Sequence, residues 1–97
     1  MTDLCIHPED FQNYHWYKYV RMADDTLCFV DAALNHSDAI EIKERSQVKS
    51  AGTFTFYPDK IVMRDYGSTT LGVDSSLCAL DECMLSDLLI RPVKTDW

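Results

Sequence analysis

The sequence predicts an α+β fold, in which an antiparallel β-sheet of hairpins is flanked by short N- and C-terminal helices. Three observations favour it. Apolar and polar residues alternate with period two in several short segments, as in half-buried strands. Helix-start signals stand at Pro8 and Asp81, near the two ends. The chain of 97 residues, 46% of them hydrophobic, has room for one modest core, so we expect a single domain over residues 1–97.

The N-terminal segment predicts a short first helix that begins at Pro8 and ends near Trp16. Two acidic residues follow the proline, and helix N-termini favour this combination. Phe11, Tyr14 and His15 then recur at helical spacing.

Two hairpins and one further strand are expected in the middle of the chain. Residues 15–22 and 27–30 form the first hairpin across a polar turn, and residues 37–43 alternate as another strand. The clearest alternation, in residues 53–64, predicts a second hairpin. Pairing Tyr57 with Lys60 places Phe54, Phe56, Ile61 and Met63 on one face. Its proline cannot adopt the positive φ of tight turns, so the loop should be a residue or two wider.

The C-terminal third predicts a helix over residues 82–90, stopped before Pro92. A longer helix from Ser76 would set Asp81 in an apolar stripe, where an unpaired carboxylate is costly. As N-cap, Asp81 becomes favourable instead. Residues 69–80 are then a strand, or a strand and a loop. Leu80 and Leu85 would form a hydrophobic staple, and the inward residues would be Met84, Leu85, Leu88 and Leu89.

Neither a membrane segment nor a metal site is predicted. The longest apolar runs have four residues, whereas a membrane helix needs about 20. The N-terminus does not look like an export signal, so we expect a cytoplasmic protein with no membrane partner. Four residues could in principle bind zinc, namely Cys5, His7, Cys78 and Cys83. Their spacing lacks the close-set CxxC pairs of structural zinc sites, so we expect buried or unpaired cysteines and no metal or cofactor.

No catalytic motif stands out. Any Cys–His nucleophile would have to be assembled from residues with no activating surroundings, and adjacent acids commonly occupy turns and helix starts. We therefore expect a protein that is not an enzyme. A small enzyme without a recognisable motif is the third alternative.

Acidic residues outnumber basic ones by sixteen to nine, which gives a net charge of −7. Residues 1–40 carry −5 and residues 67–97 carry −3, whereas residues 41–66 carry +1. One interpretation is an ordinary solvated surface. The other is an acidic face that fits the positive groove of a nucleic-acid-binding protein, its candidate residues being Asp3, Glu9, Asp10, Asp24, Asp25, Asp31, Asp38 and Glu41.

An aromatic run offers an alternative interface. It suggests a base-stacking platform, but the nearby acids argue against direct nucleic-acid binding. We expect some rings in the core and Tyr17 and Tyr19 exposed, where they would suit a protein-binding adaptor or inhibitor that docks through an aromatic or apolar patch. The run consists of Tyr14, Trp16, Tyr17 and Tyr19.

Small size, dispersed aspartates, several unpaired cysteines and absent catalytic motifs together resemble a class of proteins. The class is the small acidic inhibitors that phages make against host defence, including DNA-mimicking anti-CRISPR proteins. The resemblance is one of composition over the whole chain, and the positive middle segment departs from it. It implies a stoichiometric binder in the host cytoplasm that blocks DNA access to a CRISPR surveillance complex. Reversal of Asp24, Asp25 and Asp31 to lysine should then abolish binding.

Overall fold

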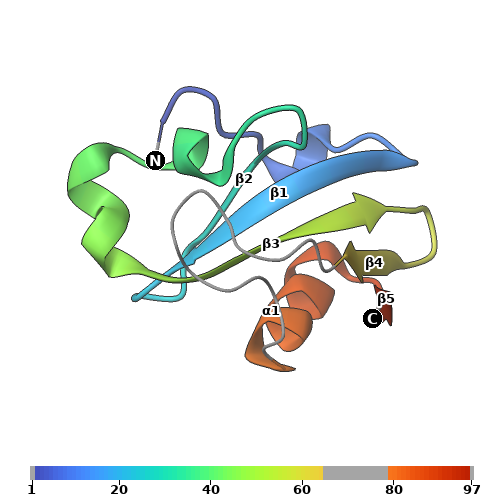
Figure 1. The fold of residues 1–97 in the computed structure, drawn as a ribbon. Helices are drawn as coiled ribbons and strands as arrows, with labels where there is room; N and C mark the ends of the chain where they lie inside the picture. Colours follow the sequence, from blue (N-terminus) through green and yellow to red (C-terminus); the bar gives the residue numbers. More distant parts are fainter. Residues whose placement is uncertain (1, 65–78, 97) are drawn as a thin grey trace.

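The computed structural model describes residues 2–64 and 79–96 and is built around a five-stranded β-sheet (Figure 1). The strand order is β2-β1-β3-β4-β5, and neighbours pair antiparallel except for β4 and β5, which pair parallel. The α+β class is confirmed, but the expectation of a purely antiparallel sheet is wrong at the β5 edge. The strands are β1 (His15–Met22), β2 (Leu27–Asp31), β3 (Val48–Phe56), β4 (Ile61–Arg64) and β5 (Val93–Asp96).

Both predicted hairpins form, β1 with β2 and β3 with β4. In the second, Phe56 lies opposite Ile61, which confirms the predicted register. The strands end at residue 56 and resume at residue 61, so the connection is the wider loop that the proline requires. The Tyr57 amide still donates to the Lys60 carbonyl at 3.0 Å, which closes the loop.

The predicted N-terminal helix is wrong beyond a single 3-10 turn, η1 (Pro8–Asp10). The chain is already extended at Phe11, whose ring stacks on Tyr17 with the centroids 4.1 Å apart. Tyr14 then takes a positive φ of 66° immediately before β1. A short isolated helix is marginal. Burial of the Phe11 ring and the pairing of β1 with its neighbours therefore decide the conformation of this segment.

The predicted strand over residues 37–43 is also wrong. These residues fold into η2 (His36–Ala39) and the beginning of η3 (Ile42–Gln47), both 3-10 helices. Each helix starts with a capping box, a reciprocal pair of hydrogen bonds between side chains and backbone amides. These local bonds override the period-two pattern. The boxes pair Asn35 with Asp38, and Glu41 with Glu44.

Apolar side chains are buried on both faces of the sheet. Successive residues of a strand point to opposite faces, so Tyr19 packs on the α1 side and Val20 on the η2 side. Figure 1 shows α1 (Ala79–Leu89) against one face, with the 3-10 segments lying away from it. The α1 side is formed mainly by Tyr17, Tyr19, Phe29, Phe54, Phe56, Ile61, Met63, Leu85 and Leu89. The opposite side is formed by Val20, Met22, Cys28, Val30, Ala39, Ile40 and Ala51.

The helix α1 begins three residues before the predicted start, at Ala79, and ends at Leu89. Leu85 and Leu89 are buried against the sheet as expected. Met84 is only half-buried and Leu88 is 48% exposed, so the apolar stripe of the helix extends past the sheet contact. Leu80 belongs to the helix and is 46% exposed, so the predicted staple is wrong. Most of the strand or loop predicted over 69–80 lies outside the described residues.

The residue after α1 is a point of backbone strain. Ile90 has a φ of 55° and is 87% exposed, and positive φ costs a β-branched residue about 1–2 kcal/mol. We expect Ile90→Gly to raise the free energy of unfolding by about 1 kcal/mol, since glycine is the preferred residue at this position. Ile90→Ala keeps the Cβ atom and should give little of this gain. Urea unfolding of both variants measures the difference, and equal stabilities would contradict the assignment of strain.

Candidate functional site

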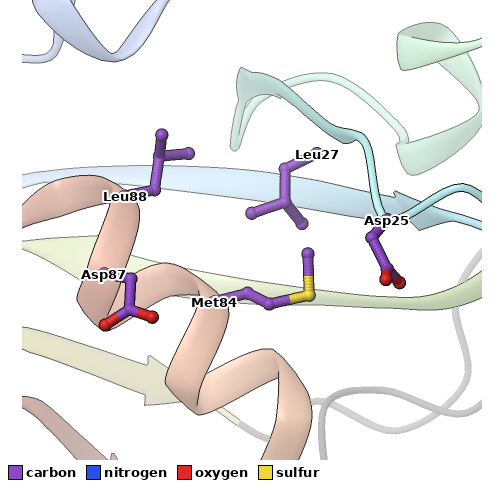
Figure 2. Close-up of a pocket in the computed structure, with 5 residues that line it drawn as sticks. All are labelled: Asp25, Leu27, Met84, Asp87 and Leu88. Atoms are coloured by element: carbon purple, nitrogen blue, oxygen red, sulfur yellow. The ribbon is translucent and has the colours of Figure 1, made fainter.

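An open groove of about 490 Å³ lies between the β1–β2 turn and α1. Its floor is apolar and comes from Leu27, Met84 and Leu88. Figure 2 shows Met84 reaching from the helix toward Leu27, with Asp25 and Asp87 on opposite sides of it. The groove thus combines an exposed apolar surface with a carboxylate from each of its two walls.

A buried polar network attaches α1 to the sheet beside this groove. The Asp81 carboxylate is fully buried and accepts hydrogen bonds from the Tyr19 hydroxyl at 2.7 Å and the Ser50 hydroxyl at 2.9 Å. Its other contact is the Arg21 Nε, at 2.6 Å. Asp81 therefore lies inside the helix, and its prediction as N-cap is wrong. Burial of its charge is tolerable because three donors satisfy it.

Arg21 also connects the network to the turn. Its Nη1 lies 3.3 Å from the Asp25 carboxylate, while its Nε contacts Asp81 of α1. One guanidinium thus contacts both elements that form the groove. The Arg21 side chain is 12% exposed and that of Asp25 is 62% exposed, so the ion pair runs from the interior to the surface. Arg21 therefore joins the two walls of the groove through its contacts with Asp25 and Asp81.

The β1–β2 turn presents two neighbouring carboxylates to solvent. The Thr26 hydroxyl and its backbone amide lower the pKa of Asp24, and that amide lies 3.0 Å from the Asp24 Oδ1. Asp25 has a φ of 67°, a conformation that aspartate tolerates better than most residues. Aspartate is therefore suited to both positions by local structure as well as by charge.

The remaining predicted acids lie elsewhere. Asp31 is at the far end of β2 from Asp25, contacts His15 Nε2 at 2.6 Å and accepts from the Ala33 amide at 2.9 Å. The hydrogen bond from the Ala33 amide makes the largest contribution to lowering the pKa of Asp31, and the hydrogen bond with His15 makes the second largest. Its roles are thus local, and it does not share a patch with the turn.

Five further acids of the predicted set precede β1 or occupy the capped 3-10 segments. Three are exposed near the N-terminus, and two take part in the capping boxes. They are Asp3, Glu9, Asp10, Asp38 and Glu41. Of the predicted set, the structure therefore brings only Asp25 to the groove, whereas Asp24 lines a separate small pocket beside the same turn. Asp87 joins Asp25 from α1, and the sequence carried no signal that would have paired this helix with that turn.

The buried and exposed members of the aromatic run are not the ones that the sequence predicted. Tyr17 and Tyr19 are 2% and 0% exposed, so their predicted exposure is wrong: both point to the α1 side of the sheet and fill the core. Tyr14 and Trp16 are instead exposed, at 71% and 40%. The Arg64 guanidinium lies over the Trp16 ring, 5.1 Å from its centroid. This small aromatic patch lies at the opposite end of β1 from the groove.

The described cysteines and acids give no sign of a metal centre. Within residues 2–64 and 79–96, no group of three or more histidine, cysteine, aspartate or glutamate side chains could hold an ion. Cys28 is buried, Cys5 is half-buried and Cys83 is exposed. Cys78 lies outside the described residues.

Burial raises the pKa of the Cys28 thiol to about 11, from 9.0 for an unperturbed thiol, with nearby Cys5 as the next contribution. Between these two values the thiol ionises in the unfolded chain but not in the folded one. We therefore expect the free energy of unfolding to fall as pH rises from about 9 to about 11. Denaturant melts should show a shallower fall for Cys28→Ala, and identical pH profiles would contradict this assignment.

Comparison with known proteins finds no matching family model, no matching curated protein and no matching solved structure. None of the helices in the described part of the chain has the length and apolar character needed to cross a bilayer. Fold and site together define an α+β protein with an acidic groove whose floor is apolar.

Proposed function

We propose that the protein is a non-enzymatic acidic inhibitor that binds a positively charged surface of a nucleic-acid-binding protein. The observation that carries this proposal is the placement of Asp25 and Asp87 around one open groove, with the exposed Asp24 next to Asp25 in the β1–β2 turn. Within the described residues, no ion pair joins Asp24 or Asp87 to a basic side chain. These charges are therefore available to a partner.

The overall charge supports the same partner. With a net charge of −7, the protein repels nucleic acid and attracts basic surfaces, which accelerates association with them. Grooves that bind DNA or RNA are lined by basic residues and are surfaces of this kind. The resemblance to acidic anti-defence inhibitors suggests a CRISPR surveillance complex as the specific target. Bound to that complex, the acidic groove and the β1–β2 turn would exclude DNA from its binding surface.

The test of this proposal is displacement of DNA. Proteins captured by the tagged chain would be identified at about 50 and about 200 mM salt, and a guide-loaded CRISPR surveillance complex would be included as a purified target. We expect the captured proteins to bind nucleic acid, to be captured in smaller amounts at the higher salt concentration, and to lose labelled DNA when the inhibitor is added. Capture of proteins without nucleic-acid-binding activity, or a ternary complex that retains its DNA, would contradict the proposal.

The exposed aromatic patch favours a second candidate function, that of an adaptor or inhibitor docking through aromatic contacts. Tyr14 also packs edge-to-face on Tyr57, with centroids 5.7 Å apart, so its ring is partly held in place. Tyrosine, tryptophan and arginine are the residues most often dominant in protein interfaces. For this candidate, Tyr14→Ala and Trp16→Ala should weaken binding more than charge reversal at the groove.

A further inference from the structure

We infer that the groove between the β1–β2 turn and α1 binds an amphipathic basic segment of the partner. In this complex an apolar side chain of the segment rests on the groove floor, and lysine or arginine residues on either side of it pair with Asp25 and Asp87. The inference rests on the proposed function and deepens it, because it names the part of the partner that is recognised and the chemistry that recognises it.

The apolar floor is the first argument. Leu88 is 48% exposed, and with Met84 and Leu27 it forms a continuous apolar surface at the edge of the sheet. The volume of about 490 Å³ lies within the range of roughly 300–1,000 Å³ typical of binding clefts. Methionine side chains adapt their shape to different apolar partners, and they are common at peptide-binding surfaces. Burial of this floor would provide attraction that does not depend on salt.

The charges flanking the floor select the occupant. Asp25 and Asp87 come from different elements and lie on opposite sides of Met84, so a segment crossing the groove meets a carboxylate on each side (Figure 2). An apolar segment flanked by acidic residues would be repelled, and so would the phosphates of nucleic acid itself. Charge complementarity therefore points to an apolar anchor flanked by basic residues.

This mode of binding differs from pure DNA mimicry. A protein that held its target through charge alone would lose most of its affinity at high salt. A groove with an apolar floor retains part of its affinity when the charges are screened. The two modes can be separated by changing the floor and the charges independently.

The experiment uses a fluorescein-labelled amphipathic peptide with leucines at positions i, i+3, i+4 and i+7 and lysines between them. One control peptide replaces the leucines by serine, and a second replaces the lysines by glutamate. Fluorescence anisotropy with the full-length protein should detect binding of the first peptide, with at least about tenfold weaker binding of each control. Equal binding of the leucine and serine peptides would overturn the inference, because the floor would then contribute nothing.

Matched protein variants assign the effect to the groove. Leu88→Ser should weaken binding of the leucine peptide by about tenfold or more, whereas Ile42→Ser should not change it. Ile42 is a suitable control because it is 84% exposed and lies in η3, outside the groove. Asp25→Asn with Asp87→Asn should likewise weaken binding, while Asp10→Asn should not. Circular dichroism checks that each variant is folded, and equal effects of Leu88→Ser and Ile42→Ser would overturn the inference.

The outcome is distinguishable from failure of the proposed function. If the protein displaces DNA from its target but does not discriminate between the leucine and serine peptides, the inhibitor function is supported and the groove inference is wrong. If it discriminates between the peptides but displaces no DNA, the groove is a basic-peptide site and the proposed function is wrong.

Discussion

Replacing Asp81 by alanine is expected to lower the free energy of unfolding by about 3–5 kcal/mol, the cost of breaking a buried ion pair from one side. The carboxylate is completely buried and accepts from Arg21, Tyr19 and Ser50. Its removal takes away the carboxylate that lies 2.6 Å from the Nε of Arg21, whose side chain is only 12% exposed. It also leaves two hydroxyl groups in the interior without that acceptor. Urea denaturation monitored by circular dichroism measures the loss.

Three control variants make this prediction specific. Asp81→Asn keeps the shape and one acceptor, so its cost should be intermediate. Asp87→Ala removes an exposed carboxylate from the same helix and should change stability by less than about 0.5 kcal/mol. In the double variant with Arg21→Met, the cost should be less than the sum of the single costs. If Asp81→Ala matched Asp87→Ala, the network would have no role in holding α1 to the sheet.

Reversing the two groove acids together with their neighbour in the turn, in Asp25→Lys with Asp87→Lys and Asp24→Lys, should weaken binding to the nucleic-acid-binding partner by about 100-fold or more. Opposed like charges across an interface cost several kcal/mol, and about 2.7 kcal/mol is already a factor of 100. Asp87 replaces Asp31 in this set because Asp31 lies at the other end of β2. Isothermal titration calorimetry against the purified partner gives the affinities.

The matched control changes net charge equally but away from the groove, in Glu9→Lys with Asp10→Lys and Asp59→Lys. It should weaken binding far less, since only long-range attraction is altered. Lysine at position 25 would carry the strain of a positive φ, so the variant with only Asp24→Lys and Asp87→Lys provides a second, less perturbed test. Equal losses in the groove and control variants would indicate that total charge, and not the groove, determines affinity.

Both hairpins could be predicted from the sequence because alternation is a local property that specifies which face of each strand is buried. Phe54 and Phe56 on one strand and Ile61 and Met63 on the other agree only in one register, and that register forms. The parallel strand β5 could not be predicted. It has four residues, and its pairing with β4 depends on how α1 returns the chain to the sheet.

The candidate site could be predicted only in part from the sequence. Composition and turn chemistry indicated Asp24 and Asp25, but the groove also needs α1, whose position depends on contact between Arg21 and Asp81, 60 residues apart. A local interpretation of Asp81 favours a helix cap, because burial without a partner would be costly. The sequence does not indicate Arg21 as the partner of Asp81, because only the fold brings the two residues together. For the same reason the sequence does not place Asp87 beside the β1–β2 turn.

Hydrogen exchange of the protein alone and in complex with its partner, measured by mass spectrometry, tests most directly that the acid-flanked groove is the binding surface. We predict that binding slows exchange in residues 23–27 and 82–89, the two segments that form the groove, and leaves residues 12–16 unchanged. Slowed exchange confined to residues 12–16 and 57–60, around the exposed Tyr14 and Trp16, would contradict this account and favour docking through the aromatic patch.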